Sequence, residues 1–158
     1  MRILIGAVGL GLLAGCGSSV EDKMVSVCTD IVKMSVIDPG AMTINSSSVI
    51  SANATEGNLT RFAGLRSGGE LNGDQKAALD IQIKNISKIN ESYASIDYTD
   101  RSSGARRDKA ICWFMDTGQG FELGSVSISG KGYSGISLLS LFVNHSRPDG
   151  LSQSNVIE

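Results

Sequence analysis

The chain has 158 residues, a formal net charge of −2 and 41% hydrophobic residues. This length suits one domain with a single hydrophobic core, and 19 glycines with only 5% aromatic residues argue against a solenoid or a coiled coil. Because the charge is slightly negative and there is no basic tail, we expect no nucleic-acid partner.

The first predicted element is an apolar segment at the N-terminus. Arg2 precedes an apolar run from Ile3 to Leu13, and the small residues Ala14 and Gly15 then lead to Cys16. A positive residue, a short apolar run and small residues before a cleaved bond are typical of a secretory signal peptide. The run is shorter than the about 20 apolar residues that a membrane-spanning helix needs.

Leu13-Ala14-Gly15-Cys16 resembles the lipobox of bacterial lipoproteins. The resemblance implies a diacylglyceryl thioether on Cys16, cleavage between Gly15 and Cys16, and acylation of the new amino group. Several acyl chains hold a protein stably on a bilayer, so the lipid bilayer is an expected partner. Because no Asp follows Cys16, the resemblance implies the outer membrane, at its periplasmic face or the cell surface. The alternative is an ordinary secretory signal with a coincidental cysteine.

The three cysteines are the next feature. Lipidation uses Cys16, which leaves Cys28 and Cys112 as a pair in an oxidising compartment. We predict that they form a disulfide, which would stabilise the fold by about 4 kcal/mol in the chain-entropy model. Two unrelated buried thiols are the alternative.

A helix is predicted directly after the anchor. Ser18 and Glu21 have the spacing of a capping box, and Pro39 with Gly40 ends the helix near Ile37. Apolar residues at helical spacing form one face: Met24, Val27, Cys28, Ile31 and Met34.

The middle of the chain predicts edge strands, a loop and a second helix. Met42 and Ile44 alternate with polar residues, and Val49 and Ile50 lie in a short Ser-rich stretch, which favours one or two edge strands. The glycine-rich segment 53–73 is expected to be a loop. Residues 74 to about 88 predict a helix with these residues facing inward: Ala78, Leu79, Ile83 and Ile86.

A hairpin follows, with arms at 93–98 and 107–115. Its second arm is apolar on both faces, which is typical of a central strand. One face carries Ala110, Cys112 and Phe114, and the other carries Ile111, Trp113 and Met115. If Cys112 bonds Cys28, the N-terminal helix covers the first face, and the second helix or the apolar segment 136–143 covers the other. Alternatively, Ile111, Trp113 and Met115 form an exposed patch for a partner.

The C-terminal part predicts a strand at 121–129, a turn at 130–132 and a short helix capped by Ser134. The fold class is therefore α+β: a small antiparallel sheet packed against an N-terminal amphipathic helix, with a second helix and one disulfide. The expected domain organisation is a removed signal peptide (1–15), a short lipidated tether (16–19), a single globular domain (20–145) and a disordered tail (146–158).

The sequence offers little for catalysis. His145 is the single histidine and adjoins the predicted tail, so we expect no enzyme, no catalytic residue, no cofactor and no metal site. Basic residues gather near the hairpin turn, where they either pair with Asp100 and Asp108 or contact an acidic glycan or lipid headgroup. These are Arg101, Arg106, Arg107 and Lys109. Several Asn-x-Ser/Thr triplets, the first at Asn45, also fit a eukaryotic glycoprotein, but the lipobox favours a bacterial source.

Two further stretches, Cys28 to Asp38-Pro39-Gly40-Ala41 and Cys112-Trp113-Phe114, resemble a group of small exported bacterial proteins of unknown function. That resemblance implies a helix bridged to an antiparallel sheet and carries no catalytic residue. We therefore expect a membrane-anchored, non-enzymatic lipoprotein that contacts an envelope protein or glycan. The alternatives are a phage- or plasmid-encoded exclusion lipoprotein that masks a receptor, and a secreted, disulfide-bonded envelope enzyme.

Overall fold

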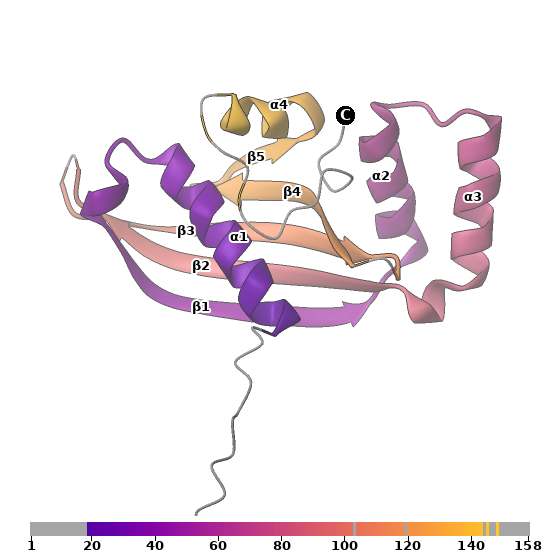
Figure 1. Cartoon of the computed structure of the whole chain (residues 1–158), viewed down its shortest axis with the longest axis horizontal. Helices are drawn as coiled ribbons and strands as arrows, with labels where there is room; N and C mark the ends of the chain where they lie inside the picture. Colours follow the sequence, from indigo (N-terminus) through magenta and orange to yellow (C-terminus); the bar gives the residue numbers. More distant parts are fainter. Residues whose placement is uncertain (1–18, 103, 119, 144, 146–147, 149–158) are drawn as a thin grey trace, which may run out of the picture.

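A computed structural model describes residues 19–102, 104–118, 120–143, 145 and 148. It has the predicted α+β class, with a five-stranded antiparallel sheet in the order β1-β2-β3-β4-β5 (Figure 1). The strands are β1 (Met42–Asn53), β2 (Asn90–Asp100), β3 (Arg106–Asp116), β4 (Phe121–Ile128) and β5 (Lys131–Ser134). The α-helices are α1 (Val20–Ser35), α2 (Glu56–Ser67), α3 (Gly73–Lys84) and α4 (Gly135–Leu139). Three short 3₁₀ turns are η1 (Pro39–Ala41), η2 (Ile86–Lys88) and η3 (Ser140–Phe142).

Helix α1 begins one residue later than the sequence predicts. The capping box is formed by Ser19 and Asp22, whose side chains each accept a backbone N–H of the other at 3.0 Å. The prediction that Ser18 and Glu21 form the capping box was wrong. The Ser18–Glu21 and Ser19–Asp22 pairs have the same spacing, and the apolar face of the helix is compatible with either starting residue. That face packs on the sheet through Met24, Val27, Cys28, Ile31 and Val32, while Met34 is half-buried.

The disulfide between Cys28 and Cys112 is present, with 5.8 Å between the two Cα atoms. It joins α1 to β3, which is the middle strand of the sheet. Strand β3 is buried on both faces from Cys112 to Met115, as predicted for a central strand. The bridge therefore connects the N-terminal helix to the best-covered strand of the fold.

Part of the second face of the sheet is covered by a helix that was not predicted from the sequence. Segment 53–73 is not a loop throughout, because α2 forms within it. Thr55 caps α2 by accepting the backbone N–H of Asn58, and Leu59 and Phe62 are fully or almost fully buried against the sheet. Helix α3 packs on α2, and it ends at Lys84, before η2.

The short helix α4 lies on the same side as α1, not on the second face as one of the expectations had it. Leu138 belongs to the core cluster that contains Cys28 and Cys112. Ser134 is the N-cap, as predicted. The predicted turn at 130–132 is shorter, because Lys131 and Gly132 already pair with β4. Of the predicted tail the structure describes only Pro148, which is buried.

The predicted hairpin is confirmed and is longer than its sequence pattern. Strands β2 and β3 pair along their whole length, from Asn90–Asp116 to Asp100–Arg106. Strand β1 is one continuous strand with a single irregularity between Ile44 and Ser46. It forms one edge of the sheet (Figure 1).

Gly124 marks a second irregularity, where the register of β3 and β4 shifts between Trp113 and Phe114. A Cβ atom at Gly124 would lie 2.8 Å from Trp113 Cε3 and 3.1 Å from Phe62 Cδ2. Glycine therefore allows the indole of Trp113 and the ring of Phe62 to approach β4.

None of the helices in the described part of the chain is both long and apolar enough to cross a membrane.

Candidate functional site

The predicted lipidation and cleavage residues, Cys16 and Gly15, lie outside the described residues. The described chain begins at Ser19, and α1 starts at the next residue. Figure 1 shows that the N-terminal end of α1 lies over the outer margin of β1, at the edge of the sheet. The chain therefore enters the domain beside this edge.

The predicted partner patch of Ile111, Trp113 and Met115 is not an exposed surface. Trp113 is only 4% exposed and Met115 is fully buried, whereas Ile111 is 38% exposed. Trp113 and Met115 are buried because α2 covers them. The rings of Trp113 and Phe62 meet edge to face with 5.9 Å between their centroids.

A buried carboxylate lies beside this aromatic contact. Glu91 Oε2 accepts hydrogen bonds from Asn58 Nδ2 at 2.7 Å, Tyr93 OH at 3.2 Å and Trp113 Nε1 at 3.3 Å. The guanidinium carbon of Arg61 lies 5.3 Å from the centroid of the Trp113 ring. Burial and the charge of Glu91 raise the pKa of Tyr93, and Arg61 opposes this shift. This cluster connects α2 to β2 and β3 through satisfied hydrogen bonds.

The Glu91 cluster was not predicted from the sequence. Its one local signal was a charged residue at an inward position of β2, opposite Met115. Because the hydrogen-bond donor Asn58 comes from α2, the cluster could not be recognised while that segment was expected to be a loop.

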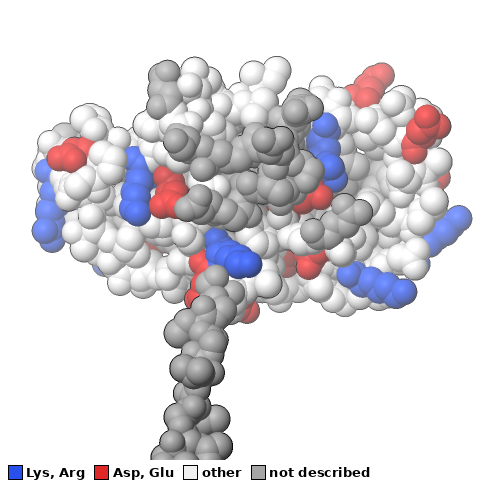
Figure 2. All heavy atoms as spheres, in the orientation of Figure 1, with Lys and Arg blue, Asp and Glu red and all other residues white. Residues whose placement is uncertain are grey.

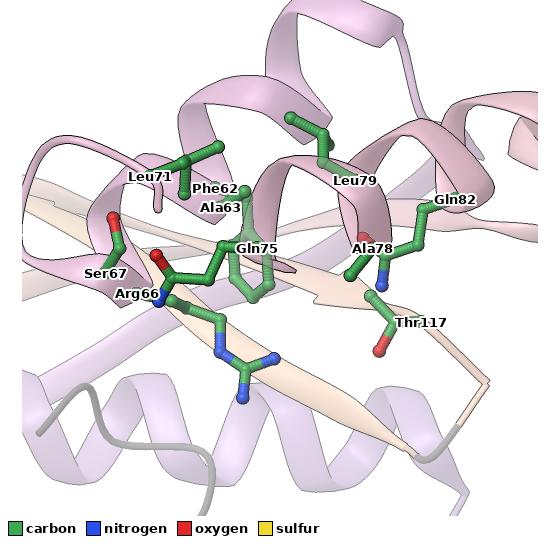
Figure 3. A pocket seen from close by; sticks show the side chains of 10 residues that line it. All are labelled: Phe62, Ala63, Arg66, Ser67, Leu71, Gln75, Ala78, Leu79, Gln82 and Thr117. Atoms are coloured by element: carbon green, nitrogen blue, oxygen red, sulfur yellow. The ribbon is translucent and has the colours of Figure 1, made fainter. Parts of the chain in front are cut away.

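A cleft of about 300 Å³ lies between α2, α3 and the residue that follows β3 (Figure 3). The polar ends of Arg66 and Gln75 lie at one side and those of Gln82 and Thr117 at the other. The remaining lining residues are Phe62, Ala63, Ser67, Leu71, Ala78 and Leu79. The lining supplies hydrogen bonds and apolar contacts, and it contains no adjacent nucleophile and base.

Beside the cleft, Arg66 Nη1 forms an ion pair with Glu122 Oε2 at 3.0 Å. Burial raises the pKa of Glu122, and the nearby Arg66 opposes this shift. A carboxyl group whose pKa is raised in the folded state binds its proton more tightly there than in the unfolded chain. The stabilisation that the protonated carboxyl contributes is present at pH values below its pKa in the unfolded chain. It is lost as the pH rises through the higher pKa of the same carboxyl in the folded protein.

We therefore expect Glu122→Gln to gain stability relative to the parent protein as the pH rises from 4 to 7, because glutamine remains neutral. Thermal unfolding at several pH values measures this difference. Glu70→Gln, at an exposed position, is the control and should follow the parent profile. A Glu122→Gln profile parallel to that of the parent protein would contradict the prediction.

Two of the four basic residues near the hairpin turn, Arg106 and Arg107, form ion pairs within the fold. Arg107 makes a two-pronged contact with Asp97, with Nε–Oδ1 at 2.9 Å and Nη2–Oδ2 at 2.7 Å. Hydrogen bonds from Arg107 and Asn45 lower the pKa of Asp97 to about 2. Arg106 pairs with Asp108 at 3.1 Å. Two of the predicted cations therefore have carboxylate partners on β2 and β3.

On the face of the sheet that carries Trp113, three apolar residues are not covered by α2 and remain exposed. Ile50 on β1 is 70% exposed and is the register partner of Tyr93 on β2. Ile111 lies two positions before Trp113 on β3 and therefore on the same face. We call Ile50, Tyr93 and Ile111 the open-face residues. Of the predicted patch only Ile111 is exposed, and on this face of the sheet it is joined by Ile50 and Tyr93.

Comparisons of the chain with protein-family models, with curated proteins and with solved structures find no match.

Proposed function

We propose that this chain is a membrane-anchored lipoprotein of the bacterial envelope that holds a non-enzymatic interaction domain close to the lipid surface. The observation that carries the proposal is Leu13-Ala14-Gly15-Cys16, followed by a helix that begins at Val20. The Cys28–Cys112 disulfide supports it, because such bonds persist in oxidising compartments outside the cytoplasm. The outer membrane is the proposed location, and an envelope protein or glycan is the proposed partner.

The short distance between Cys16 and α1 limits how far the domain can lie from the bilayer. From Cys16 to Val20 the chain has four Cα-to-Cα steps, which span at most about 14 Å when fully extended. The N-terminal turn of α1 therefore stays near the acylated cysteine. A domain held this closely meets envelope partners at or near the membrane surface.

Intact mass of the protein purified from membranes tests the anchor. We expect the mass of residues 16–158 plus several acyl chains, and incorporation of labelled palmitate. Cys16→Ala should abolish the acyl mass and the label, whereas Ser18→Ala, two residues away, should leave both unchanged. A processed protein without acyl mass would instead indicate an ordinary secretory signal.

Crosslinking in intact cells tests the interaction domain. We expect one protein or glycan neighbour to be recovered repeatedly with the anchored protein. Recovery of lipids alone would contradict this part of the proposal while leaving the anchor intact.

A further inference from the structure

Strand β1 is a long sheet edge with an open side. It has 12 residues, and among the described strands only β2 pairs with it. Most of its side chains are exposed, from Thr43 to Asn53, apart from Val49. Its outer backbone N–H and C=O groups are thus placed to form hydrogen bonds with another strand.

This edge lacks the usual protection against strand pairing. Exposed edges are commonly short, charged, interrupted by proline or twisted away by bulges. The sequence of β1, MTINSSSVISAN, has no charged residue and no proline, and its one irregularity lies near its start, between Ile44 and Ser46. In Figure 2 the left part of the lower margin is white, and charged side chains appear beside the grey N-terminal trace and at the right end of that margin. The opposite edge, β5, has only four residues.

Apolar side chains flank the position that an added strand would occupy. Val20 continues the sheet-facing stripe of α1 one turn before Met24, yet it is 56% exposed. The N-terminal end of α1 lies over the outer margin of β1 in Figure 1. On the other face, Ile50 projects from β1 itself. A sixth strand would contact Val20 on one face and Ile50 on the other.

We propose that β1 pairs antiparallel with β1 of a second copy of this chain, about a two-fold axis near Ser48. An isologous contact requires a self-complementary surface, and an uncharged strand meets its own copy without like-charge repulsion. Ser46, Ser48 and Ile50 share one face, since they pair with Asp97, Ser95 and Tyr93. With Ser48 on the axis, Ser48 faces its counterpart and Ile50 faces Ser46 of the other copy.

The two-fold axis runs perpendicular to the continuous sheet, so both α1 helices lie on the same face. The N-terminal ends of the two α1 helices then lie on the same face of the dimer, which suits two proteins anchored in the same bilayer. The pairing depends only on described residues, so it does not rest on the proposed lipid anchor.

Cysteine crosslinking in intact cells tests the pairing on the full chain. Ser48→Cys should give disulfide-linked dimers of the chain on non-reducing gels, because the axis brings its two copies together. Thr60→Cys, at an exposed position on α2, is the matched control and should not crosslink. Absence of Ser48→Cys dimers, or crosslinking only to a different envelope protein, would overturn pairing with a second copy.

Sedimentation of the full chain in detergent supplies a second measurement. We expect a dimer for the parent protein and for Thr60→Lys. Ser48→Lys places two ammonium groups opposite each other, so it should weaken dimerisation by about tenfold or more. A monomeric parent protein, or a dimer that Ser48→Lys leaves unchanged, would refute the proposal. Circular dichroism of Ser48→Lys shows whether its fold is intact, and the Ser48→Cys result stands even where it is not.

Discussion

Replacing Cys28 and Cys112 together by alanine is expected to lower the free energy of unfolding by about 4 kcal/mol. The bridge joins two residues that are 84 positions apart and so restricts the unfolded chain. When the bond is lost, the unfolded chain gains conformational entropy and the folded state becomes less stable. Both cysteines are fully buried, so their removal also takes packing from the contact between α1 and the sheet. A domain of this size commonly has about 5–15 kcal/mol of stability, so the loss is a large part of it.

Denaturant unfolding with and without a thiol reductant measures this effect. The reductant should bring the parent protein close to the double variant and leave the double variant unchanged. A parent protein insensitive to reductant, together with a loss below about 1 kcal/mol in the double variant, would show that the bridge does not restrict the unfolded chain as expected.

Trp113→Ala is expected to cost about 3–5 kcal/mol, the range for removing a large aromatic side chain from a core. The indole packs against Phe62, lies below Arg61 and donates to Glu91. Its loss leaves a cavity under α2 and removes one of the hydrogen-bond donors to a buried carboxylate. Unfolding curves followed by far-ultraviolet circular dichroism measure the change.

Ile111→Ala is the matched control for this prediction. Ile111 is on the same strand and the same face, two residues away, but it lies beyond α2 and is partly exposed. Its truncation should cost less than about 1 kcal/mol. Equal costs at the two positions would contradict the assignment of Trp113 to the core and of Ile111 to the open face.

The elements predicted correctly are those whose signals are local. The apolar stripe of α1, the strand patterns of β2 and β3, and the cap at Ser134 all lie within a few residues of the elements they define. The Cys28–Cys112 bridge followed from the number of cysteines once Cys16 had been assigned to lipidation.

Helix α2 was missed because its local signals are weak. It contains Gly57 and Gly64, and only Leu59 and Phe62 are buried. Its buried residues pack on partners later in the chain, among them Trp113 of β3, about fifty residues away, and Leu79 of α3. The Glu91 cluster and the cleft beside Arg66 both depend on α2, so neither could be derived from the sequence without it.

The length of β1 was missed for a similar reason. Serines at 46–48 and 51 have little preference for a strand on their own, and β2 supplies the partner for the whole segment. The open edge is thus a property of the assembled sheet.

The position of the disulfide also sets how the domain responds to mechanical force. A pull on the chain before Ser19 acts first on α1, and the part that it can unwind ends at Cys28, where a covalent bond reaches the middle strand. Beyond that point the force acts on the bridge and on β3, and it bypasses α2, α3 and the cleft between them. Because Trp113 of the Glu91 cluster directly follows Cys112, tension applied before Ser19 would reach this cluster through β3, whereas α2 and α3 lie inside the segment that the bridge closes.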